Sequence, residues 1–440
     1  MNLNRRTFLK KSTAASLAFA AIPILGATNS TRKYRTALIG TGWWGMNILN
    51  EAMASGECTV VGMCDVDQGH IDDATAKVEE LSGDTPRKYK DYRDLLEEEN
   101  PEIVIIGTPD HWHALQTIDS VRAGAHVYVE KPIGHTIHEG TAMVKAARDT
   151  GKQVQVGTHR RVSPHNVSGI DFLKSGRAGN IGMVRAFVHY GGGAENPQAN
   201  AEAPEGLDWD MWCGPAPLRP FNSKIHPRGF RGFLNYANGQ LGDWGIHWMD
   251  QILMWTEEKY PKRVFSTGGR HIRGEPVYNE DAQTTDAPDT QVASFEFESF
   301  TAVWEHRQYA ANEAEQANIG CYFYGTEGTF HMGWLDGWTF YPRNRSQQTI
   351  HEEPTLHQPD QQNIKELWAD FMTSIKTGEK PVCDIEVGHR STNMSLLGML
   401  SMKLGRSVEW DGENDMIVGD AEASKLLSRE YRGEWEYPEV

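Results

Sequence analysis

The sequence predicts an α/β protein made of two domains. Its 440 residues exceed what one domain usually holds, since domains commonly contain about 100–200 residues. Over residues 35–157, short apolar runs alternate with longer amphipathic runs, which is the pattern of β-α-β units and of a mostly parallel sheet. From residue 289 onward, apolar runs follow one another across short turns, which favours antiparallel strands.

The first domain is expected to alternate strands with helices. The expected strands are residues 36–39, 59–64, 103–107, 126–129 and 153–156. The expected helices are residues 44–55, 68–81, 92–98, 112–123 and 136–150. This unit closes near Gly157, so we place the first domain at residues 33–157 and the second at residues 158–440.

The second domain contains a long irregular segment, residues 191–240, rich in Gly, Pro, Asn and Trp. A loop of this length within a compact domain is usually functional or disordered, and its large aromatic residues favour function. Strands are then expected at residues 289–297, 301–306, 319–324 and 328–332. Two amphipathic helices, residues 361–376 and 386–404, end at Gly378 and Gly405.

Residues 1–27 are interpreted as an export signal. Arg5 and Arg6, followed by Thr-Phe-Leu-Lys, resemble a twin-arginine (Tat) signal, which a receptor reads as an address. The apolar stretch that follows, residues 12–25, is shorter than the roughly 20 residues of a membrane-spanning helix, and it ends in small residues suited to cleavage. We therefore expect a periplasmic or secreted protein without a membrane anchor.

Net charge and cysteine content exclude several classes of partner and site. A formal net charge of −17 argues against nucleic acid and anionic lipid as partners, and leaves small molecules open. The five cysteines are odd in number, widely spaced and without a C-x-x-C pair. Neither a disulfide framework nor a metal site is predicted, and the cysteines are interpreted as small core residues.

A glycine-rich motif joins the first expected strand to the first expected helix. Gly40, Gly42 and Gly45 match G-x-G-x-x-G, in which the first glycine permits a tight turn, the second allows a pyrophosphate to approach and the third packs helix on strand. Trp43 and Trp44 open the helix, whose N-terminal N–H groups and dipole favour an anion. The motif predicts a dinucleotide site.

Asp65 lies directly after the second expected strand, 20 residues past the motif. A carboxylate there would accept hydrogen bonds from the adenosine ribose and repel a 2′-phosphate. No arginine or lysine occupies residues 66–69. NAD is therefore the predicted cofactor, in preference to NADP.

Further along, Glu130-Lys131-Pro132 follows the fourth expected strand, at the sheet edge where open α/β proteins bind ligands. Together with the glycine motif, Thr108-Pro109-Asp110 and His113, this segment resembles the Gfo/Idh/MocA oxidoreductases, related to glucose-fructose oxidoreductase and inositol dehydrogenase. The resemblance implies a Rossmann NAD-binding domain followed by an α/β domain with an open, mainly antiparallel sheet, and a dimer or tetramer. It adds Thr108, Pro109, His113, Glu130 and Lys131 to the cofactor site.

Asp243 and His247 stand four residues apart, so on a helix they share one face. A histidine can accept an alcohol proton, and a neighbouring carboxylate can orient its ring and stabilise its cationic form. The resemblance implies a catalytic set of Lys131, Asp243 and His247. Lys131 would stabilise the developing alkoxide while hydride passes to the nicotinamide, and Asp243 would either support His247 or bind a substrate hydroxyl.

Four further residues are candidates for binding substrate. The family often places an arginine after the last strand of its first domain, and either Arg160 or Arg161 fits that position. Arg231, in the long loop, and Trp244, beside Asp243, complete the set. A tryptophan can stack on a sugar ring.

The expected substrate is a sugar, cyclitol or glycoside. An exported enzyme finds no nicotinamide pool to reoxidise its cofactor, which favours tightly bound NAD and a redox-neutral cycle. Two cycles fit: oxidation of one sugar coupled to reduction of another, or oxidation, elimination and re-reduction within one glycoside, as in NAD-dependent glycosidases. A non-catalytic sugar-binding protein on the same fold is the third interpretation.

Overall fold

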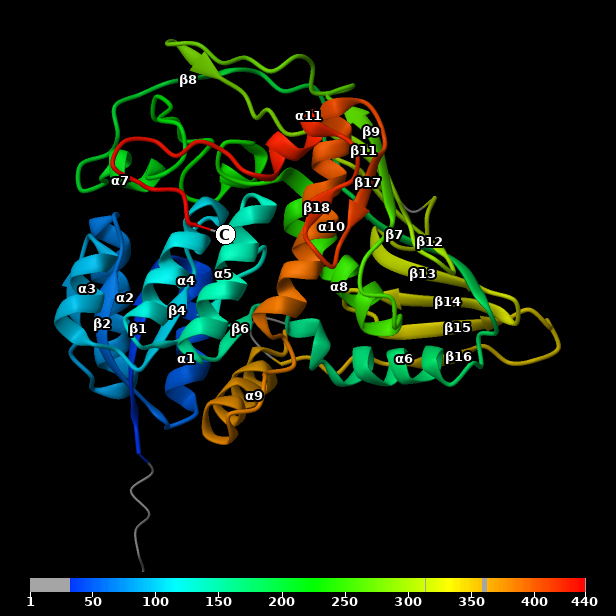
Figure 1. Cartoon of the computed structure of the whole chain (residues 1–440), viewed down its shortest axis with the longest axis horizontal. Coiled ribbons are helices and arrows are strands. Elements are labelled where there is room, and N and C mark those ends of the chain that lie inside the picture. Colours follow the sequence, from blue (N-terminus) through cyan, green and yellow to red (C-terminus); the bar gives the residue numbers. More distant parts are fainter. Residues whose placement is uncertain (1–31, 313, 358–361, 440) are drawn as a thin grey trace, which may run out of the picture. The chain divides into compact units, whose positions relative to one another are not determined.

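Two β-sheets, each covered by helices, organise the protein (Figure 1). The computed structural model describes residues 32–312, 314–357 and 362–439, so the expected Tat signal lies outside the described residues. The elements given below all belong to one unit, Lys33–Val440. Within the described residues, no helix is both long and apolar enough to cross a membrane.

The first sheet is parallel throughout and has the strand order β3-β2-β1-β4-β5-β6. Its strands are β1 (Tyr34–Ile39), β2 (Cys58–Cys64), β3 (Arg87–Tyr89), β4 (Ile103–Ile106), β5 (His126–Val129) and β6 (Val154–Val156). Its helices are α1 (Trp43–Ala54), α2 (Gln68–Ser82), α3 (Tyr92–Glu99), α4 (His113–Arg122) and α5 (Ile137–Thr150). The expected strands and helices are confirmed to within about three residues, and β3 is added.

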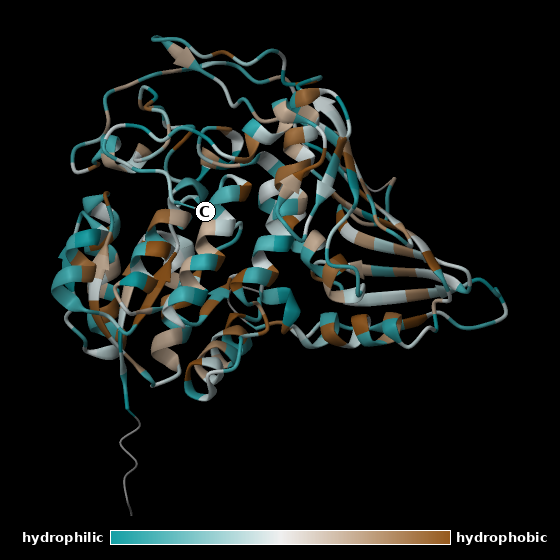
Figure 2. Cartoon of the chain, in the orientation of Figure 1, coloured by the Kyte–Doolittle hydropathy of each residue, from teal (hydrophilic) through white to brown (hydrophobic). Residues whose placement is uncertain are grey.

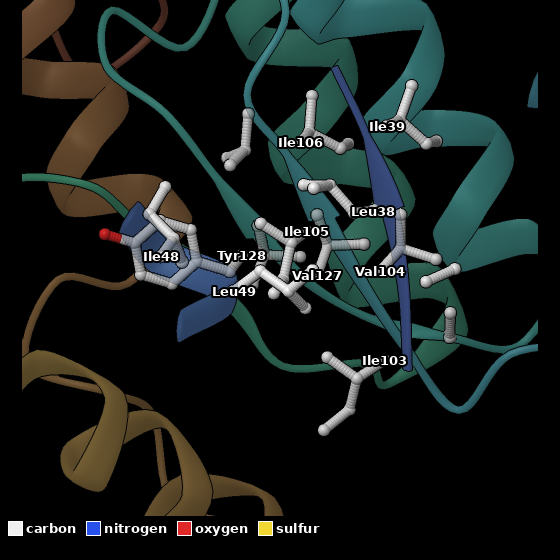
Figure 3. Packing of buried hydrophobic residues seen from close by; sticks show 14 of the residues in the cluster. Leu38, Ile39, Ile48, Leu49, Ile103, Val104, Ile105, Ile106, Val127 and Tyr128 are labelled. Carbon is white, nitrogen blue, oxygen red and sulfur yellow. The ribbon is translucent and has the colours of Figure 1, made fainter. Parts of the chain in front are cut away.

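The core of this sheet explains its pattern of apolar runs. All four residues of β4 are fully buried, because helices cover both faces of a parallel sheet and leave no face for polar residues. Figure 3 shows these side chains packed against Leu38 and Val127, and Figure 2 shows the corresponding hydrophobic strands between hydrophilic outer helix faces. Helix α9 (Ile364–Thr377), from the second half of the sequence, also packs into this core through Trp368, whose ring lies 6.2 Å from that of Tyr128.

The second sheet has the order β16-β15-β14-β13-β7-β12-β11-β9-β17-β18. Among its described strand pairs only β7 and β12 run parallel, so the mainly antiparallel sheet is confirmed. The strands are β7 (Ile181–His189), β9 (Arg263–Gly269), β11 (Thr290–Glu296), β12 (Thr301–Arg307), β13 (Ile319–Gly325), β14 (Gly328–Gly333), β15 (Trp338–Pro342), β16 (Ile350–Glu352), β17 (Val408–Asp411) and β18 (Met416–Ile417). Two short strands, β8 (Gln198–Ala199) and β10 (Ala282–Gln283), pair separately.

Long helix α10 (Ile385–Leu404) lies between the two sheets and contacts α5, β6, α8 and β9 (Figure 1). The other helices of this half are α6 (Pro164–Lys174), α7 (Trp209–Cys213), α8 (Ile246–Trp255) and α11 (Ala421–Ser424). A π-helical turn, Leu241–Gly245, leads directly into α8. All five cysteines are buried and unpaired, as expected of core residues.

Residues 191–240 form a cover fixed to the first sheet. Trp209, Trp212 and Tyr236 are central to a small apolar core within this segment. Backbone hydrogen bonds attach it to the loop after β2, from Asp208 N to Val66 O (2.9 Å) and from Gln68 N to Gly206 O (3.0 Å). The C-terminal stretch runs close to the same cover (Figure 1), and the side chain of its Arg432 donates to the carbonyls of Gly214 and Ala216.

Candidate active site

A cleft of about 530 Å³ opens at the carboxyl ends of the first sheet's strands. This is the edge at which open α/β sheets bind ligands, and the volume falls within the usual range of small-molecule sites. Gly42 and Asp65 line one part of the cleft, while Lys131 and His247 line another. Residues of the cover, among them His226 and Arg231, complete the wall.

The glycine-rich loop has the geometry that a pyrophosphate site needs. Gly40 has a φ of +87°, and a Cβ there would lie 2.7 Å from the backbone nitrogen of Thr108. A Cβ at Gly45 would lie 2.1 Å from the carbonyl oxygen of Gly40, so only glycine allows α1 to approach the strand. Gly42 meets nothing within 4 Å, which leaves open space beside the N-terminus of α1. The loop therefore fits a dinucleotide.

Asp65 also has a structural role, which its position in the sequence does not indicate. Its Oδ2 accepts hydrogen bonds from the backbone nitrogen (2.7 Å) and Oγ1 (3.0 Å) of Thr41, and its Oδ1 accepts one from the backbone nitrogen of Asp67 (3.0 Å). An ionised carboxylate offers about four acceptor positions, so capacity remains for a ribose hydroxyl. Asp65 thus also holds the glycine-rich loop in shape.

The other predicted cofactor residues lie around the loops after β4 and β5. Thr108, Pro109, His113, Glu130 and Lys131 all line the cleft. The ring nitrogens of His113 lie 2.7 Å from the carbonyl oxygen of Pro132 and 2.8 Å from that of Thr108, which braces the two loops against each other. Burial raises the pKa of Glu130 to about 7, although Lys131 and a hydrogen bond from Trp44 favour its charged form.

Lys131 and Asp243 form an ion pair at the other part of the cleft. Nζ of Lys131 donates to Oδ1 (2.9 Å) and to the carbonyl oxygen (2.8 Å) of Asp243. Arg231 donates its Nε to the same Oδ1 at 3.1 Å. Burial disfavours the charged carboxylate, but Lys131 and Arg231 outweigh this cost and lower the pKa of Asp243 to about 2. Asp243 is therefore a fixed negative charge between two cations.

His247 is a neutral imidazole on the same wall. Burial, and then the positive charges of Lys131 and Arg160, hold its pKa well below the usual value, and its Nδ1 has no hydrogen-bond partner in the described structure. Its ring packs against His159 (5.3 Å between centroids) and Trp334 (4.9 Å). Among the described residues, no side-chain hydrogen bond or ion pair joins this ring to Asp243. Aromatic packing, and not the Asp243 carboxylate, therefore orients the ring.

The arginines after β6 differ from the sequence expectation. Nε of Arg161 lies 2.9 Å from both carboxylate oxygens of Asp250, and neither Arg161 nor Arg160 lines the cleft. Arg160 lies behind the wall, its guanidinium carbon 3.8 Å from the ring centroid of Trp334. The expected Arg231 and Trp244 do line the cleft.

Two other components of the cleft wall were not predicted from the sequence. Trp334 lies in the turn between β14 and β15, where an aromatic residue in a Gly-rich turn is the only signal. Asp67, His70 and His226 place three possible metal ligands within 4.8 Å of one another, beside Asp65. The His226 nitrogen Nε2 lies 3.0 Å from Asp67 Oδ2, so the group also fastens the cover to the first sheet.

A parallel nucleotide-binding sheet whose cleft pairs a glycine-rich loop with a lysine and a neutral histidine defines a dinucleotide-dependent oxidoreductase. Family models agree with this class: residues 34–158 match the "Oxidoreductase family, NAD-binding Rossmann fold", and residues 173–268 and 339–437 match the "Oxidoreductase family, C-terminal alpha/beta domain". The chain belongs to the Gfo/Idh/MocA oxidoreductase family, and its cofactor is NAD.

The individual proteins that the chain resembles have low sequence identity to it. The chain is 25% identical over 240 residues to a glycosyl hydrolase family 109 protein of Parabacteroides distasonis, covering 50% of each protein. It spans about half the length of the curated relatives it matches. The WlbA dehydrogenase of Bordetella pertussis, solved with NADH and UDP-GlcNAcA, superposes with a TM-score of 0.63 at 18% identity, over 86% of this chain and 99% of that one.

A second solved structure gives the same result for the fold. The aldose-aldose oxidoreductase of Caulobacter crescentus, solved with glycerol, has a TM-score of 0.64 at 19% identity, over 86% of this chain and 100% of the other.

Proposed function

We propose that this protein oxidises a hydroxyl-bearing carbon of a sugar, cyclitol or glycoside, works outside the cytoplasm, and completes a redox-neutral cycle on tightly held NAD. The observation that carries the reaction is the Lys131–Asp243 pair, which lies in the same cleft as the glycine-rich loop and a neutral His247. The twin-arginine segment supports the location, and the location supports the retained cofactor.

Each side chain has a defined part in the reaction. An ammonium has three N–H donors; Lys131 uses two on Asp243, so the third is free for a substrate oxygen. His247 is unprotonated, so it can accept the hydroxyl proton while Lys131 stabilises the alkoxide charge. When bound, NAD supplies a reversible hydride acceptor, which allows the hydride removed from carbon to be returned within one cycle.

Glycoside hydrolysis through the same oxidation is the second candidate function. It is favoured by the family 109 glycosyl hydrolases among the relatives. In that cycle, oxidation of the hydroxyl two carbons from the glycosidic carbon would acidify the C–H bond on the carbon between them. Loss of that proton would expel the aglycone by elimination, water would add to the resulting double bond, and the returned hydride would restore the hydroxyl. The net reaction consumes only water, so it too is redox-neutral.

Adding sugars and aryl glycosides to the protein as purified, without nucleotide, tests the proposal. We expect substrate-dependent absorbance in the reduced-nicotinamide band, with release of the aglycone if the hydrolytic cycle operates and sugar interconversion if it does not. Lys131→Ala is the control, and it should bind sugar without either signal. Sugar binding with no absorbance change and no product from the unaltered protein, with or without added NAD, would show a non-catalytic binding protein.

A further inference from the structure

One short segment of the cover, His226–Arg231, is attached at both of its ends to the walls of the cleft. At one end, His226 Nε2 lies 3.0 Å from Oδ2 of Asp67, just beyond β2. At the other, Arg231 Nε donates to Oδ1 of Asp243 at 3.1 Å. The segment therefore bridges the loop after β2 and the π-turn before α8.

Arg228 lies between these two attachments and above the glycine-rich loop. Its guanidinium carbon is 4.9 Å from the ring centroid of Trp43, the first residue of α1. Both residues line the cleft, and Trp43 is 56% exposed. A cation over the face of an exposed tryptophan keeps its N–H donors available for another partner.

The charges around Arg228 indicate which partner it lacks. Lys131 and Arg231 share the carboxylate of Asp243, whereas Arg228 forms no ion pair with any described residue. Nearby, Gly42 leaves open space at the N-terminus of α1, the end of a helix that favours an anion. A guanidinium matches phosphate oxygens with two parallel hydrogen bonds.

We propose that Arg228 binds the pyrophosphate of the dinucleotide, and that His226–Arg231 is the strap that holds it there. The inference rests on the proposed function only in requiring that NAD binds. It makes the second half of the chain part of the cofactor site, because helix N-terminus and arginine then enclose the pyrophosphate from two sides. Exchange of the cofactor would require this segment to lift.

The test compares affinities of nucleotide-free protein for NAD, ADP and adenosine, measured by calorimetry. Arg228→Gln should weaken NAD and ADP by about 10- to 100-fold, the range of a charge-assisted hydrogen bond, and leave adenosine unchanged. The affinities of Arg228→Lys for NAD and ADP should lie between those of Arg228→Gln and the unaltered protein, since an ammonium keeps the charge but cannot make the two-point contact. Lys90→Gln, which removes another cation from the cleft wall, is the matched control and should weaken ADP by less than about threefold.

Two results would overturn the inference. One is an unchanged affinity of Arg228→Gln for NAD and ADP; the other is an equal loss for adenosine, which would show a general effect on the cleft. Without nucleotide, the two Arg228 variants should unfold at the same temperature as the unaltered protein, because Arg228 is exposed. If the unaltered protein binds no NAD, the proposed function falls with the inference; if it binds NAD and Arg228→Gln binds it equally, only the inference falls.

Discussion

Nζ of Lys131 makes two hydrogen bonds to Asp243, one to the carboxylate at 2.9 Å and one to the carbonyl oxygen at 2.8 Å. The two residues are 112 positions apart, Lys131 just after β5 and Asp243 in the π-turn before α8. Because both acceptors belong to one residue, the ammonium is held in place before substrate arrives. Such preorganisation makes electrostatic stabilisation of an alkoxide effective.

Lys131→Ala and His247→Ala should each lower turnover by roughly 100-fold or more, since proton transfer typically contributes 10²–10⁴. Both variants should still bind NAD, because the glycine-rich loop and Asp65, which are expected to hold its pyrophosphate and its adenosine ribose, are unaltered in each. Steady-state rates with a sugar that the absorbance screen identifies as a substrate, together with nucleotide content, check this. Near-normal turnover in either variant would remove that residue from the catalytic set.

Asp65→Ala should weaken NAD by about 10- to 100-fold and relax discrimination against NADP. Two effects combine: the ribose loses an acceptor, and the backbone nitrogen of Thr41 loses the partner that shapes the glycine-rich loop. Thr41→Val is the control, since it deletes only the 3.0 Å hydroxyl bond and leaves the carboxylate for both the ribose and the Thr41 backbone nitrogen, so it should weaken NAD less than Asp65→Ala does. Titrations with both nucleotides measure the losses, and unchanged affinities in Asp65→Ala would refute the assignment.

Asp110, buried at the cleft wall, should make stability depend on pH. Burial, helped by Asp243 and opposed by Arg231 and Lys131, raises the pKa of Asp110 to about 7, against about 3.9 when unfolded. Between about pH 4 and pH 7 the native state holds the extra proton, so this group's contribution to the free energy of unfolding falls as pH rises. Asp110→Asn should therefore melt at a higher temperature than the unaltered protein at pH 8, with little difference at pH 4.

Thermal melts of nucleotide-free protein at the two pH values measure this, with exposed Asp171→Asn as the control. That substitution should change stability by no more than about 0.5 kcal/mol at either pH. If the melting temperatures of Asp110→Asn and the unaltered protein differ by the same amount at both pH values, Asp110 is charged in the folded protein throughout this range.

Five of the six strands of the first sheet were predictable because each is a short, largely apolar run with a helix beside it, whereas β3, Arg-Lys-Tyr, has no such pattern. Strand β7 was not predictable either, since its last four residues are all buried and show no alternation of polar and apolar positions. Its place between β13 and β12 also depends on partners more than 100 residues away.

Within the site, the positions that follow strands were predictable, and their partners were not. Lys131, Asp65 and the glycines stand at fixed places after strands or before a helix. The four-residue spacing of Asp243 and His247 suggested a pair, but Asp243 instead bonds Lys131 and Arg231, which tertiary structure alone brings near. Trp334 and His226 likewise enter the cleft from distant turns, and no local pattern places either of them beside the residues that follow the strands.

Cofactor retention tests the central claim most directly, because redox-neutral chemistry outside the cytoplasm requires NAD to stay bound. Protein isolated natively should carry about one nucleotide per chain through gel filtration, which needs a dissociation constant near 1 nM, or roughly −12 kcal/mol. Heat-denaturing the protein and assaying the supernatant enzymatically for NAD gives the number of NAD molecules bound per chain. One equivalent is the predicted result; empty sites, with sugar-dependent turnover only on added NAD, would contradict the account and indicate a dehydrogenase that exchanges its cofactor freely.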